Sequence, residues 1–248
     1  MSAIEMKAPA KLTLSLRVVG TRSDGYHLID AEMVTLDWHD TVTIDPSSTG
    51  LSASGPYARW LPLGRSNLVS KALRHTGRTA AVHIHKALPL GGGLGGGSAD
   101  AAAVLRWAGY ADVAGAAHLG ADVAFCLVGG RARVRGIGEL VEPLSFEQID
   151  VTLVVPPMSV SSQRVYAAWD ELGGPHSDGD NDLEPAAVDA FPELAHWRDR
   201  IREATGVAPT LAGSGATWFL RGHHDLDDAL PDAVVVCTTT VPSTFKRP

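Results

Sequence analysis

Six glycines lie close together near the middle of the chain, between a predicted strand and a predicted helix. They are Gly91–Gly93 and Gly95–Gly97, and Ser98 follows them directly. Residues 80–85 have the pattern of a strand, and the alanine-rich residues 98–108 have that of a helix capped by Ser98. Because glycine has no Cβ atom, backbone N–H groups can close around an anion, and a helix N-terminus adds partial positive charge. The arrangement predicts a site for a nucleotide phosphate at Gly91–Ser98.

Three other interpretations of this run are weaker. A flexible linker is usually rich in serine on both sides, whereas Pro89 and an alanine-rich helix flank this one. A Walker A loop ends in Gly-Lys-Ser/Thr, and no lysine follows Gly97. A dinucleotide-binding loop needs an acidic residue about 20 residues further on, at the end of a strand. Asp122 lies at about that distance but precedes an apolar stretch.

The composition is that of an ordinary globular protein of 248 residues, with 45% hydrophobic and 20% charged residues. The formal net charge of −7 disfavours a protein that grips a nucleic acid backbone. We find no run of about 20 apolar residues and no secretory signal, so we expect a cytoplasmic protein that has no contact with a membrane. Cys126 and Cys237 lie far apart in apolar runs, which predicts two reduced core residues.

The hydrophobic pattern predicts an α+β protein in two halves. Residues 8–19 alternate apolar and polar side chains, which indicates a strand with Lys11, Thr13, Ser15 and Arg17 on one face. Residues 45–63 read as a loop-rich stretch. Further strands are expected over residues 29–36, 40–44, 129–138, 151–155, 218–221 and 234–241, and helices over 67–76, 165–172, 185–188 and 192–205. A boundary near residues 144–150 divides the chain into an N-terminal domain, 1–147, and a C-terminal domain, 148–248.

Three motifs in a fixed order span nearly the whole chain: residues 9–14 (Pro-Ala-Lys-Leu-Thr-Leu), 89–102 and 212–217 (Ala-Gly-Ser-Gly-Ala-Thr). On these residues the chain resembles the GHMP small-molecule kinases, which include galactokinase, homoserine kinase and mevalonate kinase. The resemblance implies the two-domain GHMP kinase fold, with an N-terminal domain like one found in a ribosomal protein and a C-terminal ferredoxin-like α/β sandwich. It also implies ATP as phosphoryl donor. We expect Mg²⁺ because phosphoryl transfer needs the phosphate charge neutralised.

Four further stretches resemble one branch of that family: residues 24–27 (Asp-Gly-Tyr-His), 119–125, 136–139 and 181–184 (Asn-Asp-Leu-Glu). Members of this branch phosphorylate the 2-hydroxyl group of a cytidine-diphosphate methylerythritol in the non-mevalonate isoprenoid pathway. The resemblance thus implies a small-molecule partner, this cytidine-diphosphate sugar alcohol. The sequence leaves open a monomer or a homodimer.

The resemblance implies roles for individual residues. Asp122 would accept the proton of the acceptor hydroxyl and Lys11 would stabilise negative charge, although an aspartate that starts a helix and a solvated strand lysine are the ordinary roles of such residues. Ser98 is a candidate phosphate or Mg²⁺ contact as well as a cap, and Asp100 is a candidate metal support or cap. The residues expected at ATP are Pro89, Leu90, Gly91, Gly92, Gly93, Leu94, Gly95, Gly96, Gly97, Ser98 and Ala99. Those expected at the acceptor are Thr13, Tyr26 and His27, the last two at the cytosine, with Gly213, Ser214 and Gly215.

The chain departs from the family pattern at a few places. Thr13 stands where asparagine is usual, Ala124 replaces a proline, and residues 109–118 leave little room for the usual helix. The departures keep two alternatives open: a GHMP kinase for a different small alcohol, and a catalytically silent nucleotide-binding relative. An RNA-binding module is a third, which the charge disfavours. His83 and His85 share a strand face, and a plain polar face explains them better than a metal site.

Overall fold

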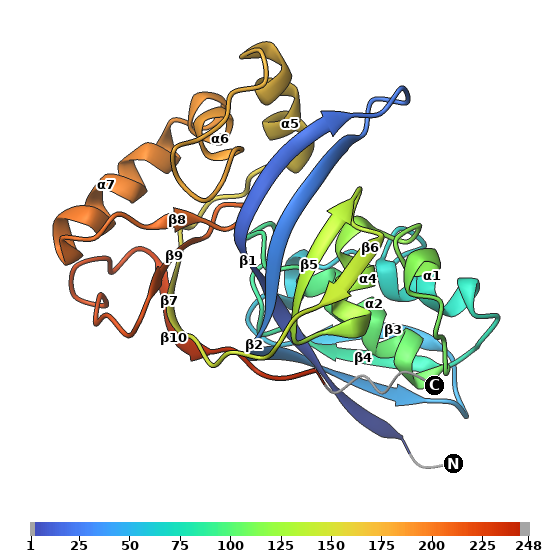
Figure 1. Cartoon of the computed structure of the whole chain (residues 1–248). Helices are drawn as coiled ribbons and strands as arrows, with labels where there is room; N and C mark the ends of the chain where they lie inside the picture. Colours follow the sequence, from blue (N-terminus) through green and yellow to red (C-terminus); the bar gives the residue numbers. More distant parts are fainter. Residues whose placement is uncertain (1–2, 244–248) are drawn as a thin grey trace.

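The computed structural model describes residues 3–243, which form two β-sheets with helices packed against them (Figure 1). The larger sheet has six strands, five of them in the order β3-β4-β2-β5-β6, with β1 paired to β2. The smaller sheet has four strands in the order β10-β7-β9-β8. Every strand of the larger sheet lies before residue 144, and every strand of the smaller sheet after residue 149. The expected α+β class is confirmed by this arrangement, while the domain division at 147/148 stays a prediction.

The larger sheet is built around two long antiparallel strands, β1 (Ile4–Thr21) and β2 (His27–Asp45). Figure 1 shows this ribbon running from the helices of the larger sheet to α5 in the other half of the molecule. The other strands are β3 (Gly50–Ser54), β4 (Ala81–His85), β5 (Arg131–Gly136) and β6 (Leu140–Pro143). We expected two strands over 29–36 and 40–44 and a loop over 45–63; both expectations were wrong, because β2 continues through residues 37–39 and β3 pairs in parallel with β4.

Helices α2 (Gly96–Trp107), α3 (Val113–Ala116) and α4 (Ala121–Val128) pack against the larger sheet, and α1 (Leu68–His75) packs against α2. The stretch 109–118 is indeed short and holds only the four-residue α3. Ser98 does not cap α2: the helix starts at Gly96 and its N-cap is Gly95, so Ser98 lies in the first turn. Helix α1 lies within the helix expected over residues 67–76, and Asn67 is its N-cap, because the Asn67 side chain accepts a hydrogen bond from the backbone N of Val69.

The C-terminal half contains β7 (Asp150–Val155), β8 (Thr210–Leu211), β9 (Trp218–Arg221) and β10 (Val234–Thr239). Its helices are α5 (Ser162–Glu171), α6 (Glu184–Ala190) and α7 (Glu193–Thr205). The short strand β8 was not expected from the sequence. None of the helices in the described part of the chain is long and apolar enough to span a bilayer.

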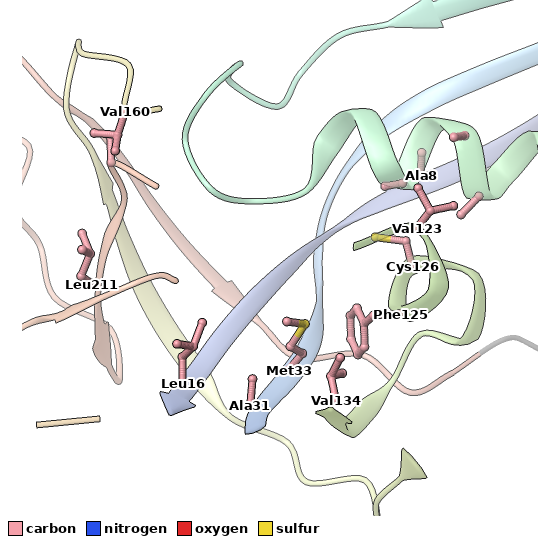
Figure 2. Close-up of a cluster of buried hydrophobic side chains, with 14 of the residues drawn as sticks. Ala8, Leu16, Ala31, Met33, Val123, Phe125, Cys126, Val134, Val160 and Leu211 are labelled. Carbon is pink, nitrogen blue, oxygen red and sulfur yellow. The ribbon is translucent and has the colours of Figure 1, made fainter. Parts of the chain in front are cut away.

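One buried cluster joins the ribbon to α4 and to the smaller sheet (Figure 2). It includes Met33 of β2, Phe125 of α4, Val134 of β5 and Leu211 of β8. Cys126 belongs to it as a free thiol, as expected. Cys237 does not: it is exposed, because β10 lies at the edge of its sheet, and the expectation of a second core cysteine was wrong. The shared core fixes α4 and the third motif relative to the long strand β1.

Candidate functional site

The glycine run lines a cavity of about 220 Å³ together with Leu68, and every residue from Pro89 to Ser98 contributes to its wall. Ala99, the last residue predicted at ATP, is fully buried behind it and does not line the cavity. The first turn of an α-helix leaves its backbone N–H groups without intrahelical acceptors, and α2 begins in this wall. The cavity therefore combines free N–H donors with the positive end of a helix, which suits a phosphate group.

Gly95 brings the glycine loop into contact with strand β1. Its φ of +65° lies in the left-handed region, and a Cβ atom there would meet Cγ of Lys11 at 2.6 Å. The backbone N of Lys11 donates to the carbonyl oxygen of Leu94 at 2.9 Å. This bond forms where the pairing register of β1 and β2 shifts, between Pro9 and Lys11. The loop is thus fixed directly against the strand that carries Lys11.

The third motif lies against the same loop from the smaller sheet. A Cβ atom on Gly93 would come within 2.8 Å of the Cα atom of Gly215, so both positions need glycine. The backbone N of Thr217 donates to the carbonyl oxygen of Gly92 at 3.2 Å, and the Thr217 hydroxyl donates to the same oxygen at 2.6 Å. The two glycine-rich segments, far apart in the sequence, therefore form one continuous surface.

Lys11 and Asp122 form an ion pair with Nζ and Oδ2 3.4 Å apart. The Lys11 side chain is 7% exposed and that of Asp122 32% exposed. Lys11 is therefore not the solvated strand lysine that its type alone would suggest. Asp122 is neither a helix cap nor fully buried: Gly120 is the N-cap of α4, and Asp122 lies in the first turn. An accessible carboxylate beside a buried ammonium group can accept a proton while nearby negative charge is stabilised.

Helix α4 fixes the position of Asp122 because all six residues that follow it in the helix are buried: Val123, Ala124, Phe125, Cys126, Leu127 and Val128. Ala124, the departure from the family's proline, is fully buried among them. Burial raises the pKa of the Cys126 thiol to about 12, with a further contribution from Asp122. The thiol next to the ion pair is therefore neutral and supplies packing only.

Thr13 is directed at Lys11. Its hydroxyl accepts a hydrogen bond from Lys11 Nζ at 3.1 Å, and the residue is 2% exposed. A Cβ atom on Gly213 would lie 3.4 Å from Thr13 Oγ1 and 3.8 Å from Lys11 Nζ. Ser214 donates a hydrogen bond of 2.7 Å to Ser162 at the start of α5. The predicted residues Lys11, Thr13, Asp122 and Gly213 thus converge at the loop.

Tyr26 and His27, both predicted at the cytosine, differ in their surroundings. Tyr26 is 60% exposed in the turn between β1 and β2, whereas the His27 side chain is packed against α5. The His27 ring stacks on Tyr166 with centroids 4.7 Å apart, and it meets Trp169 edge to face at 5.5 Å. Its Nε2 atom lies 2.8 Å from Oδ1 of Asp170. Burial raises the pKa of Tyr166, and the carboxylate of Asp122 raises it further, so the ring that stacks on His27 is within electrostatic range of Asp122.

Sequence reasoning missed several residues that hold this site in place. Asn181 donates two hydrogen bonds from Nδ2, to the carbonyl oxygens of Leu211 at 2.8 Å and Gly213 at 2.7 Å. The stretch 181–184, which resembles the family, pointed to Asn181. The neighbouring sequence did not indicate which residues its side chain would contact. Lys86, Asp40 and Asp100 form a buried ion cluster beside the glycine loop. Asp100 therefore neither caps α2 nor faces the cavity.

Within residues 3–243 no group of three or more His, Cys, Asp or Glu side chains is arranged to hold a metal ion. His83 contacts the hydroxyl groups of Ser52 and Ser54 at 2.9 Å each, and His85 contacts Ser54 at 3.2 Å, so these histidines form a polar strand face as expected. A larger cavity of about 420 Å³ lies elsewhere, between residues 37–38 and β10. The glycine loop does not line this larger cavity, and Lys11 and Asp122 line neither of the two cavities.

Comparison with known proteins agrees with this geometry. Residues 67–130 match the family model described as GHMP kinases N terminal domain. The chain is 40% identical to a 4-diphosphocytidyl-2-C-methyl-D-erythritol kinase of Paracoccus denitrificans, over 86% of this chain and 84% of the relative. It is 38% identical to the protein of the same name from Ruegeria pomeroyi, over 88% of each chain.

Solved structures show the same likeness. A crystal structure of 4-(cytidine 5'-diphospho)-2C-methyl-D-erythritol kinase superposes with a TM-score of 0.74 at 31% identity, covering 96% of this chain and 99% of the other. Homoserine kinase from Cytophaga hutchinsonii superposes with a TM-score of 0.64 at 17% identity, covering 98% of this chain and 96% of the other. The second likeness concerns the fold alone.

Proposed function

Since the chain belongs to the GHMP kinases, and within them to the family of 4-diphosphocytidyl-2-C-methyl-D-erythritol kinases, we propose that it transfers the γ-phosphoryl group of ATP to the 2-hydroxyl group of 4-diphosphocytidyl-2-C-methyl-D-erythritol. The reaction is a step of non-mevalonate isoprenoid biosynthesis. The observation that carries the proposal is the Lys11–Asp122 pair, held beside the glycine loop by the Lys11–Leu94 backbone bond.

The proposed mechanism uses the pair in two ways. The acceptor oxygen attacks the γ-phosphorus, the bond to the β-phosphate oxygen of ADP breaks, and Asp122 accepts the proton that the hydroxyl loses. Lys11 stabilises the negative charge that develops on the acceptor oxygen and the transferring group. Because Lys11 is buried, its charge acts in a medium of lower dielectric constant than water, which strengthens the effect.

The glycine loop binds the phosphates through its backbone N–H groups and the N-terminus of α2. Mg²⁺, when bound with the nucleotide, would neutralise phosphate charge, and such an ion needs few protein ligands. Ser98 fits this role, since it lines the cavity and offers a hydroxyl oxygen. Gly213–Gly215 close the site from the smaller sheet.

The cytidine end of the acceptor binds between the β1–β2 turn and α5, where His27 stacks on Tyr166. An ionised Asp170 can only accept, so His27 carries its proton on Nε2 and its Nδ1 atom is an acceptor for the amino group of cytosine. Exposed Tyr26 offers an aromatic face to the base.

A panel of acceptors tests the substrate. ADP release from Mg²⁺·ATP is measured with 4-diphosphocytidyl-2-C-methyl-D-erythritol, its uridine analogue, homoserine and mevalonate. We expect kcat/KM for the cytidine compound to exceed that for each of the others by at least 100-fold. A higher kcat/KM for another alcohol would identify that alcohol as the substrate instead. Nucleotide binding without turnover of any acceptor would favour a catalytically silent relative.

A further inference from the structure

A buried cluster of three charged side chains lies beneath the start of α2. Lys86 Nζ contacts Oδ2 of Asp40 and donates to Oδ2 of Asp100, the latter at 2.8 Å. Lys86 and Asp40 are fully buried and Asp100 is 1% exposed. No role in the proposed chemistry uses these residues, although they flank the segment that would bind ATP.

The cluster connects both ends of the glycine loop to strand β2. On the N-terminal side, Asp40 Oδ1 accepts hydrogen bonds from the backbone N atoms of Ala87 at 2.7 Å and Leu88 at 2.8 Å. On the C-terminal side, Asp100 belongs to α2. A Cβ atom on Gly96 would lie 3.0 Å from Lys86 Nζ, so the backbone of the first turn packs directly on the ammonium group.

The charges of the cluster do not balance if all three groups are ionised. Burial raises the pKa of Asp100 to about 7 against the effect of Lys86, and the neighbouring Asp40 raises it further. Burial alone would lower the pKa of Lys86, but Asp100 and Asp40 outweigh it and the pKa is raised. The other titratable group close to Asp100 is Cys126 on α4, which is neutral. Asp100 Oδ1 is one of two buried side-chain polar atoms that lack a hydrogen-bond partner in the described part of the chain.

Stability alone does not account for such a cluster. A buried ion pair is often no more stabilising than apolar residues of the same volume, because desolvation offsets the attraction. Its directional bonds do, however, fix the distance between the elements that carry it. Here those elements are β2, the residue after β4, and α2.

We propose that the Asp40–Lys86–Asp100 cluster is the positioning device of the nucleotide phosphate loop, and that a proton carried by Asp100 keeps it electrically neutral beneath the bound phosphates. The inference rests on the proposed nucleotide-binding role of residues 89–98. It predicts that the affinity for nucleotide depends on the shape and the charge of residue 100. The KM for the acceptor should not depend on this residue.

The test compares Asp100→Ala with Asp100→Asn by calorimetric titration with Mg²⁺·ADP, without any acceptor. Asp100→Ala removes one of the two Lys86 contacts, and we expect Kd to rise at least tenfold. Asp100→Asn imitates the protonated acid, and Kd should stay within threefold at pH 6.5. Asp30→Asn is the matched control, because Asp30 lies on β2 in an exposed ion pair with Arg133, away from the loop. In turnover assays, KM for the acceptor should stay within twofold in all variants.

If Asp100→Ala does not fold, the pH dependence of Kd for Mg²⁺·ADP still tests the proposal. Between pH 6.5 and 8.5 the wild-type Kd should rise at least threefold relative to that of Asp100→Asn, because only the wild type gains a negative charge below the loop. A constant ratio would overturn the proposal, as would an Asp100→Ala variant that melts earlier but binds ADP like the wild type. A wild type that binds no nucleotide would overturn the loop assignment as well. Binding of ADP with failure to use the cytidine acceptor would refute only the proposed substrate.

Discussion

The ammonium group of Lys11 and the carboxylate of Asp122 lie 3.4 Å apart, although one belongs to a strand and the other to the first turn of a helix. The lysine is shielded and the carboxylate accessible. The buried residues of α4 hold the aspartate, and the Leu94 carbonyl holds the backbone of the lysine. Chemistry at the pair therefore depends on the glycine loop as well as on its own two side chains.

Gly95→Ala should disrupt the loop. An alanine at a φ of +65° is strained, and its Cβ atom would meet Lys11. We expect a loss of roughly 1–3 kcal/mol in the free energy of unfolding and a fall of at least 100-fold in kcat/KM. Gly77→Ala is the matched control, because Gly77 has a similar φ of +62° but a Cβ atom there would meet nothing within 4 Å. Equal activity of the two variants in a steady-state assay would contradict the contact.

Thr13→Val tests the departure at that position. Valine has a similar shape but no hydroxyl, so Lys11 Nζ loses the acceptor that lies 3.1 Å away. A hydrogen bond to a charged group is worth about 1.5–3 kcal/mol, and we expect kcat to fall at least tenfold. Ser15→Ala, on the same strand, should keep its activity. An unchanged kcat in Thr13→Val would show that Lys11 does not depend on this hydroxyl.

Asp170→Ala should weaken acceptor binding with little effect on stability. The pair with His27 is fixed at 2.8 Å, but the Asp170 side chain is 55% exposed, and exposed pairs contribute little to folding. Without the carboxylate, His27 is free to change its tautomer, and we expect KM for the cytidine acceptor to rise about tenfold. KM for ATP should not change. Glu171→Gln, which alters the neighbouring pair with Arg164, is the control, and an equal rise of KM there would argue against a role of His27.

The pH dependence of stability should reveal Asp100. Its pKa is raised to about 7 in the folded protein, above the ordinary value near 4, so the folded state binds more protons between these values. Its contribution is therefore fully present below about pH 4 and is lost as the pH rises towards 7. Relative to Asp100→Asn, the free energy of unfolding of the wild type should fall across this range by at most about 1.4 kcal/mol per pH unit. Urea unfolding of both proteins at each pH measures this difference. A difference in the free energy of unfolding between wild type and Asp100→Asn that does not change with pH would contradict the assignment.

The sequence predicted the fold class and the segments that carry strong local signals, and it missed the extent of several strands. The glycine run Gly91–Gly97 connects a strand to a helix as expected, and α1 lies within the helix expected over residues 67–76. Strand β2 continues through residues 37–39 although Asp40 places a charge on the otherwise apolar face, because its partner strands decide its extent. Helix α2 begins before Ser98 because the glycine backbone can pack on Lys86.

The buried charges were not predictable from local pattern. Lys86, Asp40 and Asp100 belong to three separate segments, and each alone resembles a solvated residue. Asn181 likewise donates to the carbonyl oxygens of Leu211 and Gly213, and helices α6 and α7 separate Asn181 from these residues in the sequence. Only the packing of α2 on the sheet, and of the third motif on β1, brings these partners together.

The most direct measurement is phosphoryl transfer by Asp122→Asn beside the wild type, with Mg²⁺·ATP and 4-diphosphocytidyl-2-C-methyl-D-erythritol. Asparagine keeps the shape but cannot accept the proton, and positioned acid–base groups contribute about 10²–10⁴-fold. We expect kcat to fall by at least 100-fold while Kd for Mg²⁺·ADP stays within threefold. A variant that keeps a tenth or more of the wild-type kcat would contradict the role of Asp122 beside Lys11.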